Sequence, residues 1–186
     1  MSVATKENAV DELVEQLYQI DGKAEIVNGR IVLMSPTGGI PGEAGGGVFA
    51  SLRSYARRTG IGRAVPDNVA FIVNLPNRRS FSPDAAFWTG AAPTMKFYEG
   101  APVFAVEVRS ENDYGPKAER AIAQKRTDYF AAGTFIVWDV DLLSEDVVKS
   151  YGSDESQSPR IFRRGELADA EPAVPGWNMP VDELFA

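Results

Sequence analysis

The stretch that decides the fold is Pro102-Val103-Phe104-Ala105-Val106-Glu107-Val108, an apolar run interrupted by one carboxylate. Such a run is typical of a strand that is buried on both faces of a sheet. Residues 115–132 then have the pattern of a helix that Gly133 ends, and residues 134–140 form a second apolar run. Strand, helix and strand in this order predict a βαβ crossover in a sheet flanked by helices.

The segments on either side agree with this class of fold. Asn28-Gly29 separates two β-type runs within residues 24–34, a pattern that predicts a hairpin with a type I′ turn. Helical spacing predicts one amphipathic helix over residues 6–20 and another from residue 41 or 42 to 59, after a Gly/Pro-rich loop at residues 35–42. Further short strands are expected at residues 69–73, 83–88, 147–151 and 161–163. We therefore expect an α/β (α+β) fold with a mixed central β-sheet flanked by helices, preceded by an N-terminal helix and a β-hairpin.

Length and hydropathy suggest how this chain is organised. Its 186 residues fit one domain, residues 1–186, with the N-terminal helix inside residues 1–22 and a C-terminal tail, residues 172–186, packed on the core by its aromatic residues. No apolar run approaches the ~18 residues of a membrane span. The first 15 residues are acidic where a secretory signal would be basic and apolar. We therefore expect a cytoplasmic protein that does not associate with membranes.

Composition limits the possible chemistry. The chain has no Cys and no His, which excludes disulfides, thiolate zinc sites, cysteine nucleophiles and Ser-His-Asp catalysis. Any catalysis must use carboxylates, Lys, Tyr, Ser or a metal ion held by oxygen. The formal charge of −7 opposes non-specific attraction to polyanions, so binding of nucleic acid would need a local basic surface. The candidates for that surface are Arg53, Arg57, Arg58, Arg63, Arg78 and Arg79.

Glu107 is the most informative single residue, because a carboxylate in an apolar strand is unfavourable unless a cation or hydrogen bonds compensate it. Asp84 stands at the start of another expected strand, and two neighbouring strands can bring both carboxylates together. Such a pair can hold Mg²⁺ together with waters and phosphate oxygens. The alternative is that Glu107 forms a structural ion pair with Arg or Lys while Asp84 caps a turn. A glycosidase that uses the two carboxylates as acid and nucleophile or base is a third interpretation.

The helix after Glu107 carries a candidate catalytic lysine. Lys125 and Tyr129 are four residues apart and therefore share a face of this helix. A lysine on that face, directed toward the strand ends, could orient a water or stabilise negative charge on a phosphate in the transition state. Alternatively, Lys125 only covers apolar surface with its side-chain stem.

Five blocks of this sequence resemble the Uma2 family. They are residues 25–37, 81–87, 105–110, 125–133 with Trp138-Asp139, and 174–177. The resemblance extends from about residue 25 to 185 and implies membership of the PD-(D/E)XK nuclease superfamily, with its restriction-endonuclease-like mixed sheet. It also implies a Mg²⁺- or Mn²⁺-dependent endonuclease with DNA as its substrate.

The resemblance also suggests which residues form the site. Asp84 matches the metal-binding aspartate of the Pro-Asp motif, Glu107 the second metal ligand, and the backbone carbonyl of Val108 a third. The usual motif lysine, two residues beyond the glutamate, is replaced here by Arg109. The family's pattern therefore suggests Lys125, on the following helix, as the catalytic lysine.

Three further residues are weaker candidates. Gln124 neighbours Lys125. Arg109 shares a strand face with Glu107 by period-two alternation and could be a phosphate clamp or the cation that neutralises Glu107. Glu43, near the start of the second helix, matches the acidic residue that many nuclease relatives have there, although any Glu is favourable at a helix N-terminus.

These observations predict a metal-dependent endonuclease. In this hypothesis Asp84, Glu107 and the Val108 carbonyl hold Mg²⁺ or Mn²⁺, a metal-bound water attacks phosphorus, and Lys125 assists. The alternative is a catalytically inactive interaction or nucleic-acid-binding module, which Arg109 in place of lysine and the acidic composition favour. A homodimer is also expected, because a nuclease of 20.2 kDa cuts both strands most simply as a two-fold pair.

Overall fold

A mixed six-stranded sheet forms the centre of the molecule in the computed structural model, which describes residues 12–185. The strand order is β11-β10-β9-β8-β6-β3. β8 and β9 pair in parallel, whereas the other neighbours in this sheet are antiparallel. The strands are β3 (Arg63–Pro66), β6 (Ala85–Trp88), β8 (Phe104–Val108), β9 (Ile136–Val140), β10 (Val148–Gly152) and β11 (Arg160–Phe162).

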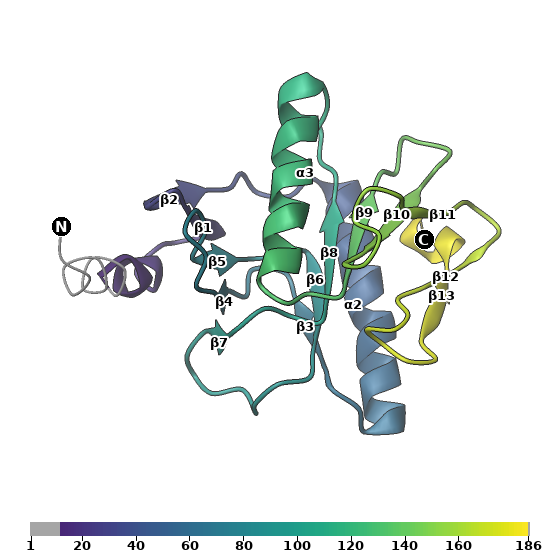
Figure 1. Cartoon of the computed structure of the whole chain (residues 1–186). Coiled ribbons are helices and arrows are strands. Elements are labelled where there is room, and N and C mark those ends of the chain that lie inside the picture. The colour runs from purple at the N-terminus through teal and green to yellow at the C-terminus, as the bar shows by residue number, and fades with distance from the viewer. Residues whose placement is uncertain (1–11, 186) are drawn as a thin grey trace.

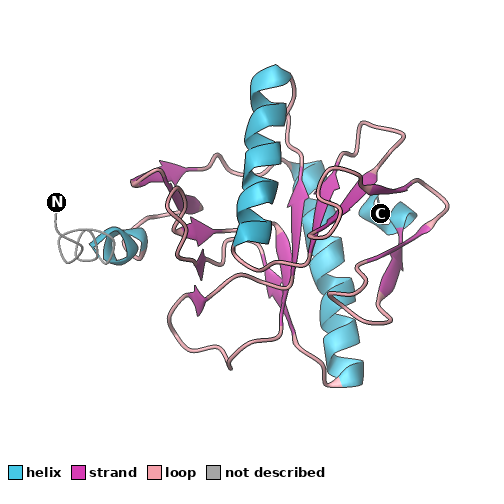
Figure 2. Cartoon of the chain, viewed as in Figure 1, coloured by secondary structure: helices cyan, strands magenta, loops and turns pink. Residues whose placement is uncertain are grey.

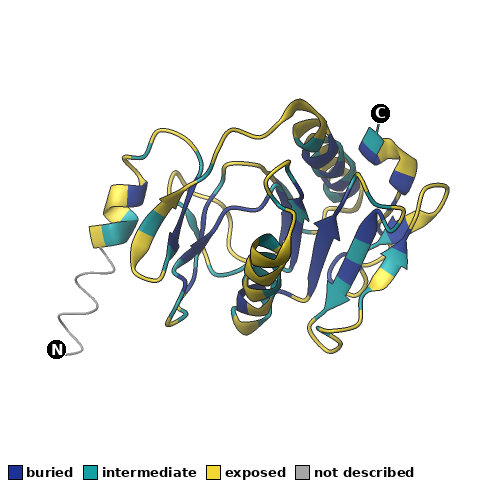
Figure 3. Cartoon of the chain, turned by 90° about the horizontal axis from the view of Figure 1, so that it is seen from above, coloured by how far each residue is buried: buried dark blue, intermediate teal, exposed yellow. Residues whose placement is uncertain are grey.

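Two helices cover the two faces of this sheet (Figure 1). α3 (Pro116–Ala131) connects the parallel strands β8 and β9, and α2 (Gly39–Thr59) packs on the other face. Side chains along β8 alternate between the helices: Phe104 and Val106 join the cluster that includes α2, whereas Ala105 joins the cluster that includes Tyr129 of α3. The view from above shows the central strands largely buried between the two helices (Figure 3). The predicted βαβ crossover and the mixed central sheet flanked by helices are therefore confirmed.

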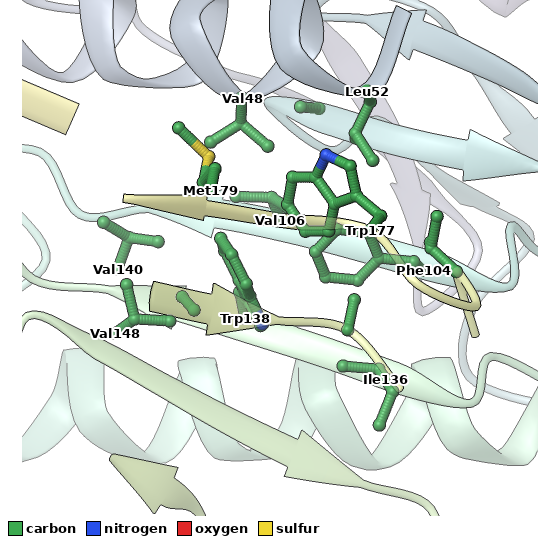
Figure 4. Packing of buried hydrophobic residues seen from close by; sticks show 14 of the residues in the cluster. Val48, Leu52, Phe104, Val106, Ile136, Trp138, Val140, Val148, Trp177 and Met179 are labelled. Atoms are coloured by element: carbon green, nitrogen blue, oxygen red, sulfur yellow. The ribbon is translucent and has the colours of Figure 1, made fainter. Parts of the chain in front are cut away.

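The larger part of the core lies between the sheet and α2 (Figure 4). Val48 and Leu52 of α2 face a group of aromatic rings, in which Trp138 lies 5.2 Å from Phe104 and 5.3 Å from Trp177, centroid to centroid. The C-terminal elements complete this cluster: β12 (Leu167–Asp169), β13 (Asn178–Pro180) and the 3₁₀ helix η1 (Val181–Phe185), which contacts α2. The end of the described chain thus helps to hold α2 on the sheet.

Small strands form a further group beside the central sheet, to the left of α3 in Figure 2. β1 (Ala24–Val27) and β2 (Arg30–Leu33) form the predicted hairpin, with φ of 51° at Asn28 and 69° at Gly29, as a type I′ turn requires. β4 (Phe71–Ile72), β5 (Ser80–Phe81) and β7 (Tyr98–Glu99) form a three-stranded sheet. The hairpin is joined to it where the Ile26 N–H donates to Ser80 Oγ, 2.8 Å away.

The sequence-based boundaries differ from the structure in several places. The first helix covers residues 12–17 of the described chain, so it ends before residue 20, and its expected start at residue 6 lies outside the described residues. α2 begins at Gly39, inside the expected loop, because Pro41 is tolerated in a first helical turn where its missing N–H has no intrahelical partner. β3, β5, β7, β12 and β13 were not predicted. Such short strands exist through their pairing partners rather than through propensity.

Gly62, directly before β3, is a position where a side chain cannot be accommodated. Its φ is +59°, and a Cβ there would lie 2.4 Å from Cε1 of the Phe87 ring. We expect Gly62→Ala to lower the free energy of unfolding by about 2–3 kcal/mol, from backbone strain and overpacking together. Gly60→Ala is the matched control, because Gly60 also has a positive φ, +72°, but no atom lies within 4 Å of an added Cβ. We expect this variant to lose about 1 kcal/mol of unfolding free energy, from backbone strain alone. Urea denaturation measures both, and equal effects would contradict the overpacking contribution.

Candidate active site

The backbone pairing of β6 and β8 brings Asp84 and Glu107 together. The paired residues end at Ala85 opposite Val106, so Asp84, which directly precedes β6, and Glu107, which directly follows Val106, lie at the same end of this strand pair. Two hydrogen bonds hold Asp84 there: the Asp84 N–H donates to the Val106 carbonyl (3.0 Å), and the Val108 N–H donates to Asp84 Oδ2 (2.7 Å). The two predicted carboxylates, 23 positions apart in sequence, are therefore neighbours at one end of the strand pair.

The Val108 carbonyl faces the same side as Asp84. In a strand, the N–H and the C=O of one residue point to the same edge. The Val108 N–H points to Asp84, whereas the N–H of the next residue, Arg109, donates to Val140 on the β9 side. The third predicted oxygen thus points to the β6 side of β8, where Asp84 lies.

Glu107 is held by side chains from α3. Lys125 Nζ lies 2.7 Å from Glu107 Oε2, and the Tyr129 hydroxyl donates to Glu107 Oε1 over 2.6 Å. Lys125 and Tyr129 thus use one face of α3, as their spacing predicts, because Glu107 lies on the sheet face that α3 covers. Glu107 is neutralised by an ammonium group and not by Arg109.

Glu25 of β1 is the second carboxylate partner of Lys125, with Nζ 2.9 Å from Glu25 Oε1. It is 2% exposed, accepts a hydrogen bond from the Ser82 N–H (2.9 Å), and pairs with the Arg78 guanidinium. Arg78 in turn donates from Nε to Asp128 Oδ2 of α3, 2.9 Å away. The hairpin, α3 and the segment before β6 are joined through these charges.

Lys23, directly before β1, occupies the other side of Asp84. Its Nζ lies 2.6 Å from Asp84 Oδ1 and 2.7 Å from Asp67 Oδ1, and Asp67 directly follows β3. The five carboxylates and three cations form two sets of ion pairs, which together we call the ion-pair cluster: Lys23 with Asp67 and Asp84, and Arg78 and Lys125 with Glu25, Glu107 and Asp128. With every group ionised, each of the two sets carries one net negative charge.

The pKa shifts follow from burial and from these neighbours. Burial alone would lower the pKa of Lys125, but Glu107 and Glu25 raise it above its ordinary value, so the ammonium keeps its charge. Burial raises the pKa of Glu107; Lys125 opposes this rise, while Asp84 and Glu25 add to it, and the net pKa is raised. A cation close to Glu107 would favour its ionised form.

A cleft of about 190 Å³ leads to Asp84 and Asp67. Its α2 side is formed by the turn containing Gly42, Gly45 and Gly46. Gly45 lets α2 pack closely on Asp84, because a Cβ at this position would lie only 3.3 Å from Asp84 Cβ. A larger cavity of about 390 Å³, beside Ile136 and Gly152, contains none of the predicted site residues. We therefore relate only the smaller cleft to the candidate site.

Three weaker candidates lie away from the Asp84–Glu107 pair. Arg109 is bound to Asp139 through two hydrogen bonds of 2.7 and 2.8 Å and also pairs with Glu119 of α3. Gln124 donates to Asp128 rather than to Glu107. Glu43 is exposed on α2, and the cleft beside Asp84 is lined by Gly42 and Gly45 instead. The expectation that Arg109 neutralises Glu107 is therefore wrong, because Asp139 and Glu119 already take its guanidinium.

The expected basic surface is only partly present. Arg78 is buried in the ion-pair cluster and cannot contribute to a surface. Arg53, Arg57, Arg58 and Arg63 are exposed. In the backbone register of β3 and β6, Arg63 lies opposite Trp88, whereas Pro66 lies opposite Ala85, the residue after Asp84. The arginine at the start of β3 therefore lies at the opposite end of the β3–β6 pair from the carboxylates.

The donor set fits a hard divalent cation. Asp84, Glu107 and the Val108 carbonyl offer only oxygen, and Mg²⁺ is commonly held by one or two carboxylates while it keeps several waters. Within residues 12–185, no group of three or more acidic side chains is positioned to hold a metal ion. The ammonium groups of Lys23 and Lys125 lie beside these carboxylates instead.

Sequence reasoning missed three members of the site: Lys23, Glu25 and Asp67. Glu25 had a usable signal, since Ala24-Glu25-Ile26-Val27 places a carboxylate in an apolar strand just as the segment around Glu107 does. Lys23 and Asp67 lie outside the strands, and no local pattern marks them. Only the folded chain shows that both contact the same site.

The mixed sheet with a helix on each face, and the carboxylates at the same end of the β6–β8 pair, define the class of protein: a restriction-endonuclease-like nuclease fold. The chain belongs to the Uma2 family, whose model, described as "Putative restriction endonuclease", matches residues 10–182. The fold is similar to the crystal structure of a "putative nuclease belonging to DUF820" from Anabaena variabilis ATCC 29413, with a TM-score of 0.71 and 15% identity over 92% of this chain and 96% of that one. No curated protein matches the chain. The resemblance seen in the sequence is thus confirmed.

Proposed function

We propose that this protein is a Mg²⁺- or Mn²⁺-dependent endonuclease that hydrolyses phosphodiester bonds in DNA. The observation that carries the proposal is that Asp84 and Glu107 lie at the same end of the β6–β8 pair, with the Lys125 ammonium 2.7 Å from Glu107. Membership of a nuclease family supports the same reaction class.

Asp84, Glu107 and the Val108 carbonyl would hold the ion. A divalent ion bound there supplies two effects: it lowers the pKa of a water molecule, and it neutralises charge on the phosphate. The protein contributes the oxygens in a fixed arrangement, because the Val108 N–H restrains Asp84 and the Tyr129 hydroxyl restrains Glu107.

Lys125 stabilises the charge that develops on the phosphate. In the reaction a water oxygen bonds to phosphorus as a hydroxide equivalent, the bond to the leaving deoxyribose oxygen breaks, and that oxygen takes up a proton. The transition state gathers negative charge on the phosphate oxygens, where a fixed ammonium is favourable. Glu25 keeps the Lys125 ammonium close to Glu107, since Nζ is 2.9 Å from Glu25 Oε1.

A cleavage assay with controlled metal content tests the proposal. We expect purified protein to nick or cut plasmid DNA in the presence of Mn²⁺ or Mg²⁺, to stop when a chelator is added in excess, and to resume when the metal is restored. Cleavage that continues unchanged in chelator would contradict a metal-dependent mechanism. DNA left intact with every divalent ion tested would contradict the nuclease activity itself.

A second candidate is a catalytically inactive module that keeps the nuclease fold. The specific observation in its favour is that Asp84 and Glu107 are each paired with an ammonium group, from Lys23 and Lys125 respectively. Lysine at the usual motif position is also replaced by Arg109, which is bound to Asp139. Calorimetric titration with Mn²⁺ distinguishes the two functions, because the inactive module is expected to release no heat of binding at this site.

The proposal includes a homodimer in the cytoplasm. A two-fold pair of sites can cut both strands of a duplex, whereas one site must act twice. In the described part of the chain, no helix combines the length and apolarity needed to cross a bilayer. Sedimentation analysis with and without a short duplex measures the assembly, and a monomer under both conditions would contradict the dimer.

A further inference from the structure

We infer that Lys23 is a functional residue of the metal site: its ammonium holds the place of a divalent cation at Asp84 Oδ1 and has to leave that oxygen before the ion can bind. The inference rests on the proposed function, since it concerns the same site. It assigns to Lys23 a role as competitor of the ion, distinct from the role of Lys125 at the reacting phosphate.

The geometry places the ammonium on a proposed ligand atom. Lys23 Nζ lies 2.6 Å from Asp84 Oδ1, while Asp84 Oδ2 is already committed to the Val108 N–H. Oδ1 is therefore the oxygen that Asp84 has left for a cation. An ion bound at Oδ1 and an ammonium hydrogen-bonded to the same oxygen are both cations, so each weakens binding of the other.

The second partner of Lys23 shows that this position attracts cations. Asp67 Oδ1 lies 2.7 Å from Nζ, so one ammonium group satisfies two carboxylates from different elements. The carboxylates Asp84 and Asp67 also line the cleft under the first turns of α2, which gives an ion a route to them. Without a cation in this place, two carboxylates would face each other unneutralised, which is unfavourable.

Lys23 can leave without disrupting the fold. Its side chain is 13% exposed, and that of Asp67 is 42% exposed, so the ammonium lies close to solvent. A lysine side chain has a flexible four-carbon stem, in contrast to the planar guanidinium of arginine. The backbone of residue 23 remains fixed by the hydrogen bond from the Met34 N–H to the Lys23 carbonyl. Movement of the side chain alone is therefore sufficient.

Removal of the ammonium is expected to strengthen metal binding. We expect Lys23→Met to bind Mn²⁺ at least about tenfold more tightly than the wild type in calorimetric titration, since a partly buried ion pair no longer has to be broken. Added Mn²⁺ should also raise the Tm of the variant more than that of the wild type, because the ion replaces the missing charge. Lys96→Met, in the exposed loop before β7, removes the same charge elsewhere and should leave Mn²⁺ affinity unchanged.

The outcomes separate this inference from the proposed function. Mn²⁺ affinity that is equal or weaker in Lys23→Met than in the wild type overturns the role of Lys23 and leaves the nuclease proposal standing. The absence of Mn²⁺ binding in both proteins overturns the metal site, and the inference falls with it.

A measurement on the wild type avoids dependence on the variant's folding. In a crystal of the wild-type protein soaked with Mn²⁺, we expect the ion at Asp84 and the Lys23 ammonium moved away from Oδ1. Mn²⁺ bound to Asp84 while Lys23 keeps its hydrogen bond to Oδ1 would overturn the inference.

Discussion

Glu107→Gln is expected to lower the rate of metal-dependent DNA cleavage by about 10³-fold or more, while the protein remains folded. The amide has the shape of the carboxylate but lacks its charge, and loss of a charged metal ligand removes several kcal/mol of transition-state stabilisation. The fold should survive because the amide oxygen can still accept a hydrogen bond from Tyr129, and Lys125 retains Glu25 as its partner. Asp84→Asn is expected to have an effect of the same order.

The rate of plasmid cleavage in Mn²⁺ measures this effect, with the circular dichroism spectrum as a check on folding. Glu145→Gln is the matched control, because Glu145 is exposed in the turn between β9 and β10 and loses the same charge. We expect the control to cut DNA at the wild-type rate. Cleavage by Glu107→Gln at an undiminished rate would mean that the carboxylate pair is not the catalytic site.

Arg78→Met is expected to lower the free energy of unfolding by about 3–5 kcal/mol, the cost typical of removing one partner from a buried ion pair. The Arg78 side chain is 7% exposed, and it lies between Glu25 and Asp128, which are 3% and 5% exposed. Removing the guanidinium leaves two buried negative charges with less positive charge beside them. Because Glu25 also binds Lys125, the same change should disturb the site as well as the fold.

Urea denaturation of Arg78→Met and of Arg163→Met tests the role of burial. Arg163 pairs with Asp146 at the surface, where the side chains are 57% and 38% exposed, so we expect a loss below about 1 kcal/mol. A similar loss of stability in both variants would show that the buried network contributes no more than a surface ion pair.

Local patterns in the sequence were sufficient for the main elements of the fold. Asn28-Gly29 predicted the hairpin turn because few other residue pairs tolerate two successive positive φ values. Gly60, with φ of +72°, ended α2 where expected, and the apolar runs around Val106 and Val137 became the parallel strands of the crossover. The short strands were not predictable in this way, since two or three residues carry no periodicity of their own.

A site residue was predictable from the sequence where a charged side chain stands among apolar neighbours or at the start of a strand. Glu107 stands out as a charge in an apolar strand, and Asp84 as an acidic residue at the start of another. Lys125 was suggested by its position on one helix face with Tyr129 and by family resemblance, and its contact with Glu107 depends on how α3 crosses the sheet. Arg109 was misinterpreted because alternation shows which face a side chain occupies, but not which partner on that face binds it.

The amino-acid sequence alone determined the order of the elements, the absence of histidine and thiol chemistry, and the carboxylates available for a site. Those properties depend on residue type and on neighbours along the chain. Only the tertiary structure decided which cations pair with those carboxylates. Lys23 and Asp67, for example, meet Asp84 although they lie 61 and 17 positions before it. Charges interact through distances in space, and the pairing of β6 with β8, the docking of α3 and the position of the hairpin set those distances.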